Sequence, residues 1–219
     1  KILIFLVIIF LMVVLSVILG KNEIILWINN NLQALINYSD LNPVKSKIYF
    51  FFIYVALTSI SLPVAFILGL LSGMLFDIYY AVSIVSFSSS IGATLAFLLS
   101  RFLFKDYFQK TFKEQYNKIN KGFTDNGAYY LYALRMTPIF PYFIINLTFG
   151  LTTMKTWVFY AVTQIGMLPM TILVSFTGKE MLNVLTTEVG FNSNILVLLV
   201  LFGLLPLIFK HVIKKYLII

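Results

Sequence analysis

Residues 126–154 read NGAYYLYALRMTPIFPYFIINLTFGLTTM, an apolar stretch that is interrupted near its middle by Pro138 and Pro141. A second stretch of 29 residues, 48–76, reads IYFFFIYVALTSISLPVAFILGLLSGMLF and is interrupted by Pro63. A continuous helix of this length would extend for about 43 Å at ~1.5 Å per residue, whereas the hydrocarbon core of a bilayer is about 30 Å thick. Two full crossings would need about 40 residues. Each stretch therefore predicts a re-entrant hairpin, which enters and leaves a membrane by one face.

The hairpin tips are expected to be polar. Non-helical backbone at membrane depth has to be buried in protein or line a water-filled cavity, because lipid offers it no hydrogen bonds. A proline in a helix also frees a backbone carbonyl, which nearby polar side chains can satisfy. The residues that we expect at the tips are Pro63, Pro138, Pro141, Ser61, Thr137 and Asn146.

The composition indicates an all-α integral membrane protein. Sixty per cent of the 219 residues are hydrophobic, 11% are charged, and the mean hydropathy is +0.95. A soluble domain of this size needs a charged surface. The chain contains no cysteine, which excludes disulfides, thiolate catalysis and cysteine-based metal sites. Its one histidine, His211, lies in a basic tail without the partners that metal or catalytic chemistry uses. We expect no metal and no cofactor.

Two terminal segments flank the hairpin regions. Residues 2–19 are apolar except for Ser16, which is long enough for a spanning helix or for a signal peptide. No small-x-small cleavage site follows Leu19, so residues 1–20 are expected to be a retained transmembrane anchor. Residues 179–219 are expected to form an outer loop and a C-terminal spanning helix with a basic tail.

The chain between these segments repeats itself with an offset of 78 residues. The first hairpin stretch is followed by the 23 uncharged residues 78–100, and the second by the 23 uncharged residues 156–178. Pro63 coincides with Pro141 under this offset. Apolar residues at helical spacing precede both hairpins and predict helices that lie in the membrane interface. The repeats are therefore residues 21–100 and 101–178, each an interfacial helix, a hairpin and a spanning helix.

Basic residues predict the orientation. If the N-terminus lies inside, the first hairpin returns outside and the second inside, 12 of the 16 basic residues are on the inner side. The remaining four, Lys21, Lys45, Lys47 and Lys179, lie outside. The two repeats then have inverted topology, so that their hairpin tips approach from opposite faces. Enrichment in Ile, Lys, Asn, Phe and Tyr is typical of a bacterial genome rich in A and T, which favours a cytoplasmic membrane with both termini in the cytoplasm.

Three charged residues are candidates for function. Arg135 is the one charge between Asp125 and Lys155, and its guanidinium suits a phosphate; the alternative is an arginine that extends to the inner interface. Arg101 ends a spanning segment, where it is an interface anchor or a second ligand of the same headgroup. Asp77 is a possible proton site if buried, or a carboxylate favoured at a helix start. The small residues Gly69, Gly73, Gly92, Gly150 and Gly166 are expected to let helices pack closely.

The sequence resembles the DedA superfamily, and within it the SNARE-associated Golgi protein, or VTT-domain, branch. The resemblance covers about residues 45–180. Its most specific part is Arg135-Met136-Thr137-Pro138-Ile139-Phe140-Pro141 through Asn146 to Gly150-Leu151-Thr152, together with Gly92 to Arg101 and Gly166 with Pro169. It implies two opposed re-entrant hairpins and the movement of lipids between leaflets. Many members carry an acidic residue after the first-hairpin proline, where this chain has Val64-Ala65-Phe66, so proton coupling is not implied here.

We therefore expect a lipid translocator that moves a phosphate-bearing lipid, such as a phospholipid or a polyprenyl phosphate, past Arg135. Membrane lipids are the expected partners. A carrier of a small soluble ion and a membrane-shaping scaffold remain alternatives. The clustered acids or histidines of lipid phosphatases and CDP-alcohol transferases do not occur, so no enzyme is expected. The net charge of +8 follows the inside bias of the basic residues and gives no reason to expect nucleic-acid binding.

Overall fold

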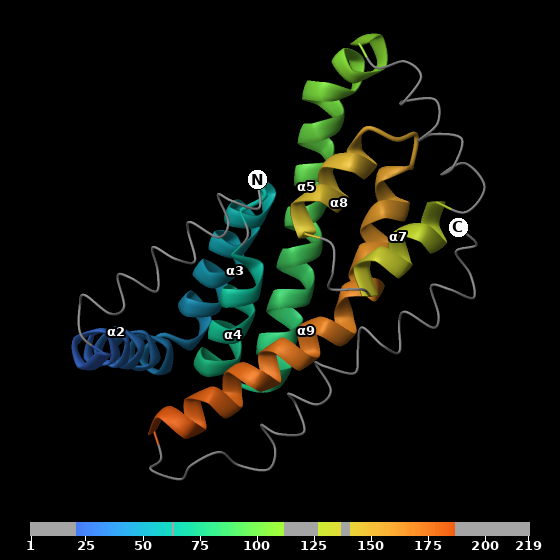
Figure 1. The fold of residues 1–219 in the computed structure, drawn as a ribbon. Coiled ribbons are helices and arrows are strands. Elements are labelled where there is room, and N and C mark those ends of the chain that lie inside the picture. The colour runs from blue at the N-terminus through green and yellow to red at the C-terminus, as the bar shows by residue number, and fades with distance from the viewer. Residues whose placement is uncertain (1–20, 63, 112–126, 137–140, 187–219) are drawn as a thin grey trace. The chain divides into compact units, whose positions relative to one another are not determined.

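The computed structural model describes residues 21–62, 64–111, 127–136 and 141–186, which contain helices and no strand. The expected anchor of residues 1–20, the expected C-terminal helix beyond residue 186, and the tip residues Pro63, Thr137 and Pro138 lie outside this range. The chain divides into two compact units, Lys1–Ser46 and Lys47–Ile219. Each unit is described by itself (Figure 1).

The first unit contains α2 (Lys21–Leu41) and the start of α3 (Pro43–Ser59). Pro43 occupies the first position of α3, where a missing N–H costs no hydrogen bond. The turn between the helices is closed by hydrogen bonds from the amide of Asn42 to the Tyr38 carbonyl, 2.9 Å, and from the amide of Ser46 to the Asn42 carbonyl, 3.0 Å. The hydroxyls of Ser39 and Ser46 are 3.4 Å apart across this turn.

In the second unit, the first proline-interrupted stretch forms two helices, α3 and α4 (Ala65–Leu75). The last turn of α3 closes with the Ser61 amide on the Thr58 carbonyl, 3.0 Å, and the Leu62 amide on the Leu57 carbonyl, 3.2 Å. Ser61 has φ of 62°, so these bonds form a Schellman motif with serine in the left-handed position that glycine usually takes. The sequence break at 61–63 is thus a helix end in the structure.

The helices α3 and α4 run antiparallel where their side chains meet. Phe50, early in α3, contacts Phe76 beyond the end of α4, with ring centroids 5.3 Å apart. Tyr54 lies one turn later and donates a hydrogen bond of 3.0 Å to the Ala65 carbonyl at the start of α4. The stretch therefore doubles back on itself.

The second stretch also forms two short helices, α7 (Gly127–Met136) and α8 (Tyr142–Gly150). Pro141 precedes α8, and its carbonyl accepts the first hydrogen bond of that helix, from Ile144 at 3.0 Å. Tyr130 packs on Phe149 with centroids 6.4 Å apart, while Arg135 bonds Asn146. Later residues of α7 thus meet earlier residues of α8, and this pair is antiparallel too.

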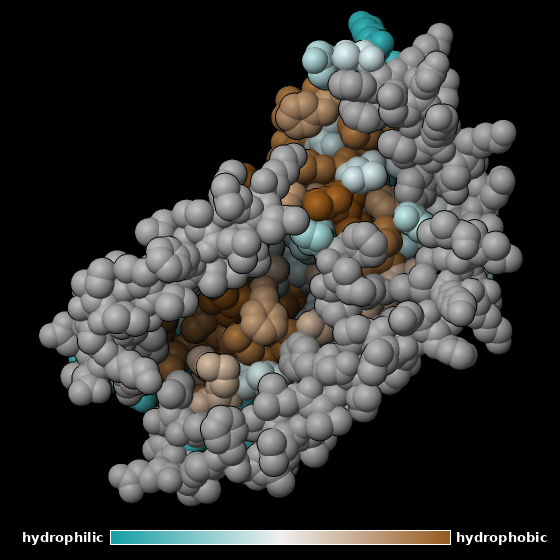
Figure 2. Space-filling view, in the orientation of Figure 1, coloured by the Kyte–Doolittle hydropathy of each residue, from teal (hydrophilic) through white to brown (hydrophobic). Residues whose placement is uncertain are grey.

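Two helices of the described part are long and apolar enough to cross a membrane, α5 (Ile78–Thr111) and α9 (Thr156–Thr186). The sequence placed the end of the first at Ser100 and a separate interfacial helix after it. Instead α5 continues to Thr111, since no proline or glycine interrupts residues 101–111. Its 34 residues extend for about 51 Å, more than the ~30 Å of hydrocarbon. Its C-terminal end carries the hydrophilic side chains at the top of Figure 2, whereas the middle of that face is hydrophobic.

The starts of the two long helices and one contact between them follow the 78-residue offset. They start at Ile78 and Thr156, and they meet where the Gln164 amide donates a 2.5 Å hydrogen bond to the Ser86 hydroxyl, two residues 78 positions apart. Phe97 stacks on Phe159 at 4.2 Å, so a later residue of α5 meets an earlier one of α9. The two helices cross in opposite directions at equivalent positions.

The second helix of each proline-interrupted stretch, α4 or α8, packs on the long helix of the other half. In α4, a Cβ on Gly73 would collide with the backbone carbonyl of Ser175 in α9. In α8, a Cβ on Gly150 would lie 2.5 Å from the backbone carbonyl of Phe97 in α5. Residues 97 and 175 are also 78 apart. The contact of α4 with α9 is therefore the counterpart of the contact of α8 with α5. The remaining glycines of the expected packing set lie at helix contacts as well: Gly69 against α9, Gly92 against α3 and Gly166 against α7.

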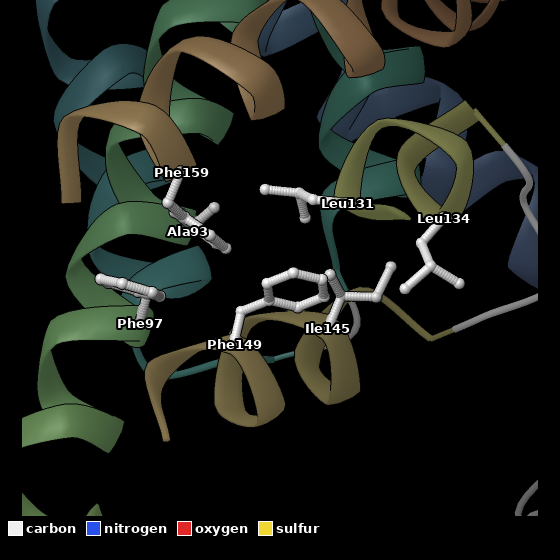
Figure 3. Close-up of a cluster of buried hydrophobic side chains, with 7 residues drawn as sticks. All are labelled: Ala93, Phe97, Leu131, Leu134, Ile145, Phe149 and Phe159. Atoms are coloured by element: carbon white, nitrogen blue, oxygen red, sulfur yellow. The ribbon is translucent and has the colours of Figure 1, made fainter. Parts of the chain in front are cut away.

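The hydrophobic core of the second unit joins α5, α7, α8 and α9. Figure 3 shows the buried side chains of this cluster pointing toward one another. Three phenylalanines supply most of its volume: Phe97 and Phe149 both contact Phe159, with centroids 4.2 and 6.3 Å away. The remaining members are Ala93, Leu131, Leu134 and Ile145.

Arg101 ties α5 to the end of α8. Its Nη2 donates to the carbonyls of Thr152, 2.9 Å, and Met154, 2.6 Å, and its Nε donates to the carbonyl of Gly150 at 3.3 Å. The guanidinium also lies over the Phe97 ring, 4.3 Å from its centroid. A cation at these carbonyls is favourable because the C-terminal end of a helix is its negative pole.

Replacement of Gly73 by alanine is expected to destabilise the protein, because the added Cβ meets backbone that cannot rotate away. Overpacking of this kind costs ~1–3 kcal/mol. Thermal unfolding of the purified protein in detergent measures the effect. Ser83→Ala is the control, since Ser83 is exposed on α5 and bonds only to the carbonyl of Tyr79 in its own helix. Equal melting temperatures for both variants would contradict the close α4–α9 contact.

Arg101→Ala is expected to lower the free energy of unfolding by about 2 kcal/mol or more, since charge-assisted hydrogen bonds to three carbonyls are lost. The free energy of unfolding of Arg101→Lys should lie between those of Arg101→Ala and the wild type, because lysine keeps the charge but not the planar fork. The same thermal unfolding assay applies. An unchanged melting temperature in Arg101→Ala would show that the residue does not secure α8.

Candidate functional site

Arg135 lies in the last turn of α7 and is buried, with 7% of its surface exposed. Its Nη2 donates a hydrogen bond of 2.6 Å to the Asn146 Oδ1 of α8, and its Nε donates one of 3.3 Å to the Thr163 hydroxyl of α9. The guanidinium carbon is 5.3 Å from the ring centroids of both Tyr142 and Phe159. Three helices therefore hold this side chain in one place.

Glycine makes room for the arginine stem. A Cβ on Gly166 in α9 would lie 2.9 Å from the Arg135 Cβ and 3.5 Å from its Cγ. The backbone of α9 is therefore directly against the methylene groups of Arg135. A side chain at position 166 would require the stem of Arg135 or the backbone of α9 to shift.

No acidic residue neutralises Arg135 within the described part of the chain. Its hydrogen bonds go to a neutral amide and a neutral hydroxyl, and its other contacts are aromatic faces. A charge removed from water is costly unless it is paired and hydrogen-bonded. A guanidinium has five N–H donors, and those two acceptors leave part of this capacity for a ligand. The arrangement is suited to an anion.

A cavity of about 320 Å³ opens beside Arg135. Its walls come from residues 54–69 of the first proline-interrupted stretch, from Val85 of α5, from the start of α8 and from the middle of α9. Apart from Arg135, Thr171 and the two tyrosines, the lining side chains are apolar. The lining residues are Tyr54, Leu62, Ala65, Phe66, Gly69, Val85, Arg135, Pro141, Tyr142, Phe143, Met167, Met170, Thr171 and Val174.

Other buried polar groups lie in α8 and α5. The Tyr142 hydroxyl donates to the Ser89 carbonyl at 2.7 Å, close to Asn146 and Thr58. Asn146 is fully buried, and its Nδ2 makes no hydrogen bond of acceptable geometry with the described residues. The Ser90 hydroxyl in α5 is also buried and makes no such hydrogen bond with the described residues. Such groups retain hydrogen-bonding capacity for water at the centre of an otherwise apolar protein.

The structure brings together some of the residues that the sequence singled out. Arg135 and Pro141 line the cavity, and Asn146, within α8, accepts a hydrogen bond from Arg135. Ser61 closes α3. Arg101 is not in the lining and bonds the end of α8, so its role as a headgroup ligand stays a prediction. Asp77 is exposed directly before α5.

Sequence reasoning missed Thr163, Tyr142 and Tyr54 as members of the site. Thr163 and its neighbour Gln164 are adjacent polar residues inside a spanning segment, which was an available signal. The tyrosines carried no such signal, since this chain has 13 of them. Their positions depend on how α3 and α8 pack. Among the described residues, no group of three or more His, Asp or Glu side chains is placed to hold a metal ion.

Comparison with known proteins identifies a domain family and several relatives. The VTT domain matches residues 62–180, which include the first proline-interrupted stretch from Leu62 onward, α5, the second stretch, and α9 as far as Glu180. Transmembrane protein 41B of Xenopus tropicalis is 28% identical over 189 residues, covering 84% of this chain and 68% of that protein. The human protein of the same name is 26% identical over 189 residues, covering 84% and 65%. The transmembrane protein 41 homolog of Dictyostelium discoideum is 30% identical over 155 residues, covering 69% and 46%.

No solved structure matches the chain. The domain match extends over more than half of the 219 residues, and the relatives are transmembrane proteins by name. The chain is a membrane protein of the VTT-domain family, in the DedA superfamily.

Proposed function

We propose that this protein is a lipid translocator, which moves a phosphate-bearing lipid between the leaflets of a membrane. The observation that carries the proposal is the buried guanidinium of Arg135, which has no acidic partner in the described part of the chain and borders an apolar cavity. Its planar fork matches the oxygens of a phosphate. Phospholipids and polyprenyl phosphates share that chemistry.

The energetic reason is the cost of moving a charge through hydrocarbon. An ionised phosphate in bare lipid costs many kcal/mol. Arg135 supplies a compensating charge, and the polar groups behind it, Asn146 and Thr163, hold it toward the cavity. A site of this kind lowers the barrier without needing an energy source, which is consistent with the exposed position of Asp77.

Two opposed re-entrant hairpins in an inverted repeat would place this site near the middle of the bilayer. The antiparallel pairs α3–α4 and α7–α8 support the hairpins, and the crossing of α5 and α9 at Ser86 and Gln164 supports a two-fold relation between the halves. A two-fold axis across oppositely directed helices inverts one half with respect to the other. With the basic residues inside, both termini would face the cytoplasm of a bacterial cell.

The lining of the cavity favours this proposal over a carrier for a soluble ion. An ion with its own hydration shell needs several polar ligands, whereas this lining is mainly apolar and has one charge. A scaffold without transport would give no reason for an unneutralised arginine to be buried among α7, α8 and α9.

Arg135→Gln is expected to slow lipid movement by about tenfold or more, since a loss of ~1.4 kcal/mol in binding the phosphate is already tenfold. The measurement is dithionite bleaching of a fluorescent phospholipid in vesicles containing the purified protein. Lys110→Gln makes the same charge change at the exposed end of α5 and should leave the rate unchanged. A wild-type rate in Arg135→Gln would exclude Arg135 from the transport path.

Asn146→Asp is expected to abolish transport while keeping the protein folded. The change is nearly isosteric and places a carboxylate at the Oδ1 position, 2.6 Å from Nη2 of Arg135, where it pairs with the cation in place of a lipid phosphate. The bleaching rate and the melting temperature are both measured. Asn37→Asp, an exposed site in α2, is the matched control. Normal transport in a folded Asn146→Asp protein would contradict the need for an unpaired arginine.

A further inference from the structure

The cavity beside Arg135 continues as a wedge between α4 and α9. At its closed end the two helices are in backbone contact, since a Cβ on Gly73 would meet the Ser175 carbonyl and one on Gly178 would meet the Leu70 carbonyl. The lining then includes Gly69 and Val174, where a Cβ on Gly69 would lie 2.7 Å from the valine Cγ1. Small residues thus fix where the wedge closes.

The wedge widens toward the start of α4 and the middle of α9. Its walls there are Ala65 and Phe66 on one side and Met167 and Met170 on the other. These side chains offer no hydrogen bond to a charged group, and methionines adapt readily to the shape of an apolar ligand. The one cation of the lining, Arg135, lies beside this apolar surface.

The mouth of the wedge is apolar as well. Leu62 is 39% exposed, Phe66 51% and Phe143 37%, and all three line the cavity. If the protein lies in a bilayer, we expect this apolar rim to contact hydrocarbon rather than water. A ligand that enters here must present an apolar surface at the rim and a negative charge at Arg135.

We propose that the wedge between α4 and α9 binds the hydrocarbon chain of an anionic amphiphile whose phosphate is held by Arg135. The inference rests on the proposed function and goes beyond it: the substrate would be recognised by its head and its chain together, with the first carbons of the chain inside the protein. The chemical class is an alkyl phosphate.

Size and charge both support a single chain. About 320 Å³ lies at the lower end of small-molecule pockets, which occupy ~300–1,000 Å³. The space accommodates a phosphate with a short segment of one chain, so that the remainder extends through the apolar mouth. A free phosphate would leave the methionine wall exposed to water, whereas an alkyl phosphate covers it.

Photolabelling of the full chain in dodecyl maltoside, which contains no phosphate, tests the inference. The probe is dodecyl phosphate with a diazirine near the head end of its chain, and peptide mass spectrometry locates the labels. Labels are expected on Phe66, Met167 and Met170. Labels confined to the exposed residues Ile172 and Phe176 of α9 would overturn the inference.

Met170→Trp is expected to fill the wedge and to reduce its labelling at least several-fold. If Met170→Trp does not fold, Ala65→Phe takes its place, because it fills the wedge from the opposite wall. Phe176→Trp, on the same helix but outside the lining, is the control and should label as wild type. Labelling that none of these variants changes would contradict binding in the wedge.

Competition separates a lipid from a free phosphate. Unlabelled dodecyl phosphate should displace the probe, and an excess of inorganic phosphate should not; equal displacement by both would overturn recognition of the chain. Retention of radiolabelled dodecyl phosphate by the purified protein tests whether Arg135 binds the phosphate. If Arg135→Gln abolishes retention but the labels lie outside the wedge, binding of the chain in the wedge is refuted while binding of the phosphate by Arg135 is supported. Retention independent of Arg135 would refute the proposed function at its site.

Discussion

One cation buried without an acidic partner is the interaction on which the described structure depends. Every element near Arg135 contributes to keeping it charged and oriented: α8 supplies the Asn146 carbonyl oxygen, α9 supplies the Thr163 hydroxyl and the bare backbone at Gly166, and two aromatic rings cover the guanidinium. Neutral ligands of this kind lower the cost of burial without cancelling the charge. A carboxylate in their place would give a more ordinary ion pair and a site with no remaining affinity for an anion.

Close backbone contacts make this arrangement possible. Short helices such as α4 and α8 bury little surface by themselves, and they are held because glycines let them approach the long helix of the other half directly. Gly73 and Gly150 serve this purpose at reciprocal contacts, and Arg101 adds a polar link from α5 to the end of α8. The broken stretches are thus stabilised by neighbouring helices, which replace the hydrogen bonds and packing that a continuous helix would have had.

The sequence was sufficient to place the helix breaks and the starts of the two long helices, because proline, glycine and charge act locally and leave a readable pattern. The residue at the centre of the site, Arg135, was also found, since a charge in an apolar stretch is rare. The end of α5 was missed because Arg101 looked like an interface anchor, whereas it bonds carbonyls about 50 residues later in the chain. Tyr54, Tyr142 and the methionines of α9 were missed for a related reason: which face of an apolar helix lines a cavity is set by tertiary packing, and these helices are apolar on all sides.

The 78-residue offset has a consequence for the electrical symmetry of the protein. Position 57, which corresponds to Arg135, is a leucine, so the two halves share an architecture but not a charge. Two identical halves would have brought a pair of arginines toward one centre, and their mutual repulsion in a medium of low permittivity would have opposed assembly. In the described part of the chain the two halves thus share one buried positive centre, and the site that we propose would accommodate one anion at a time.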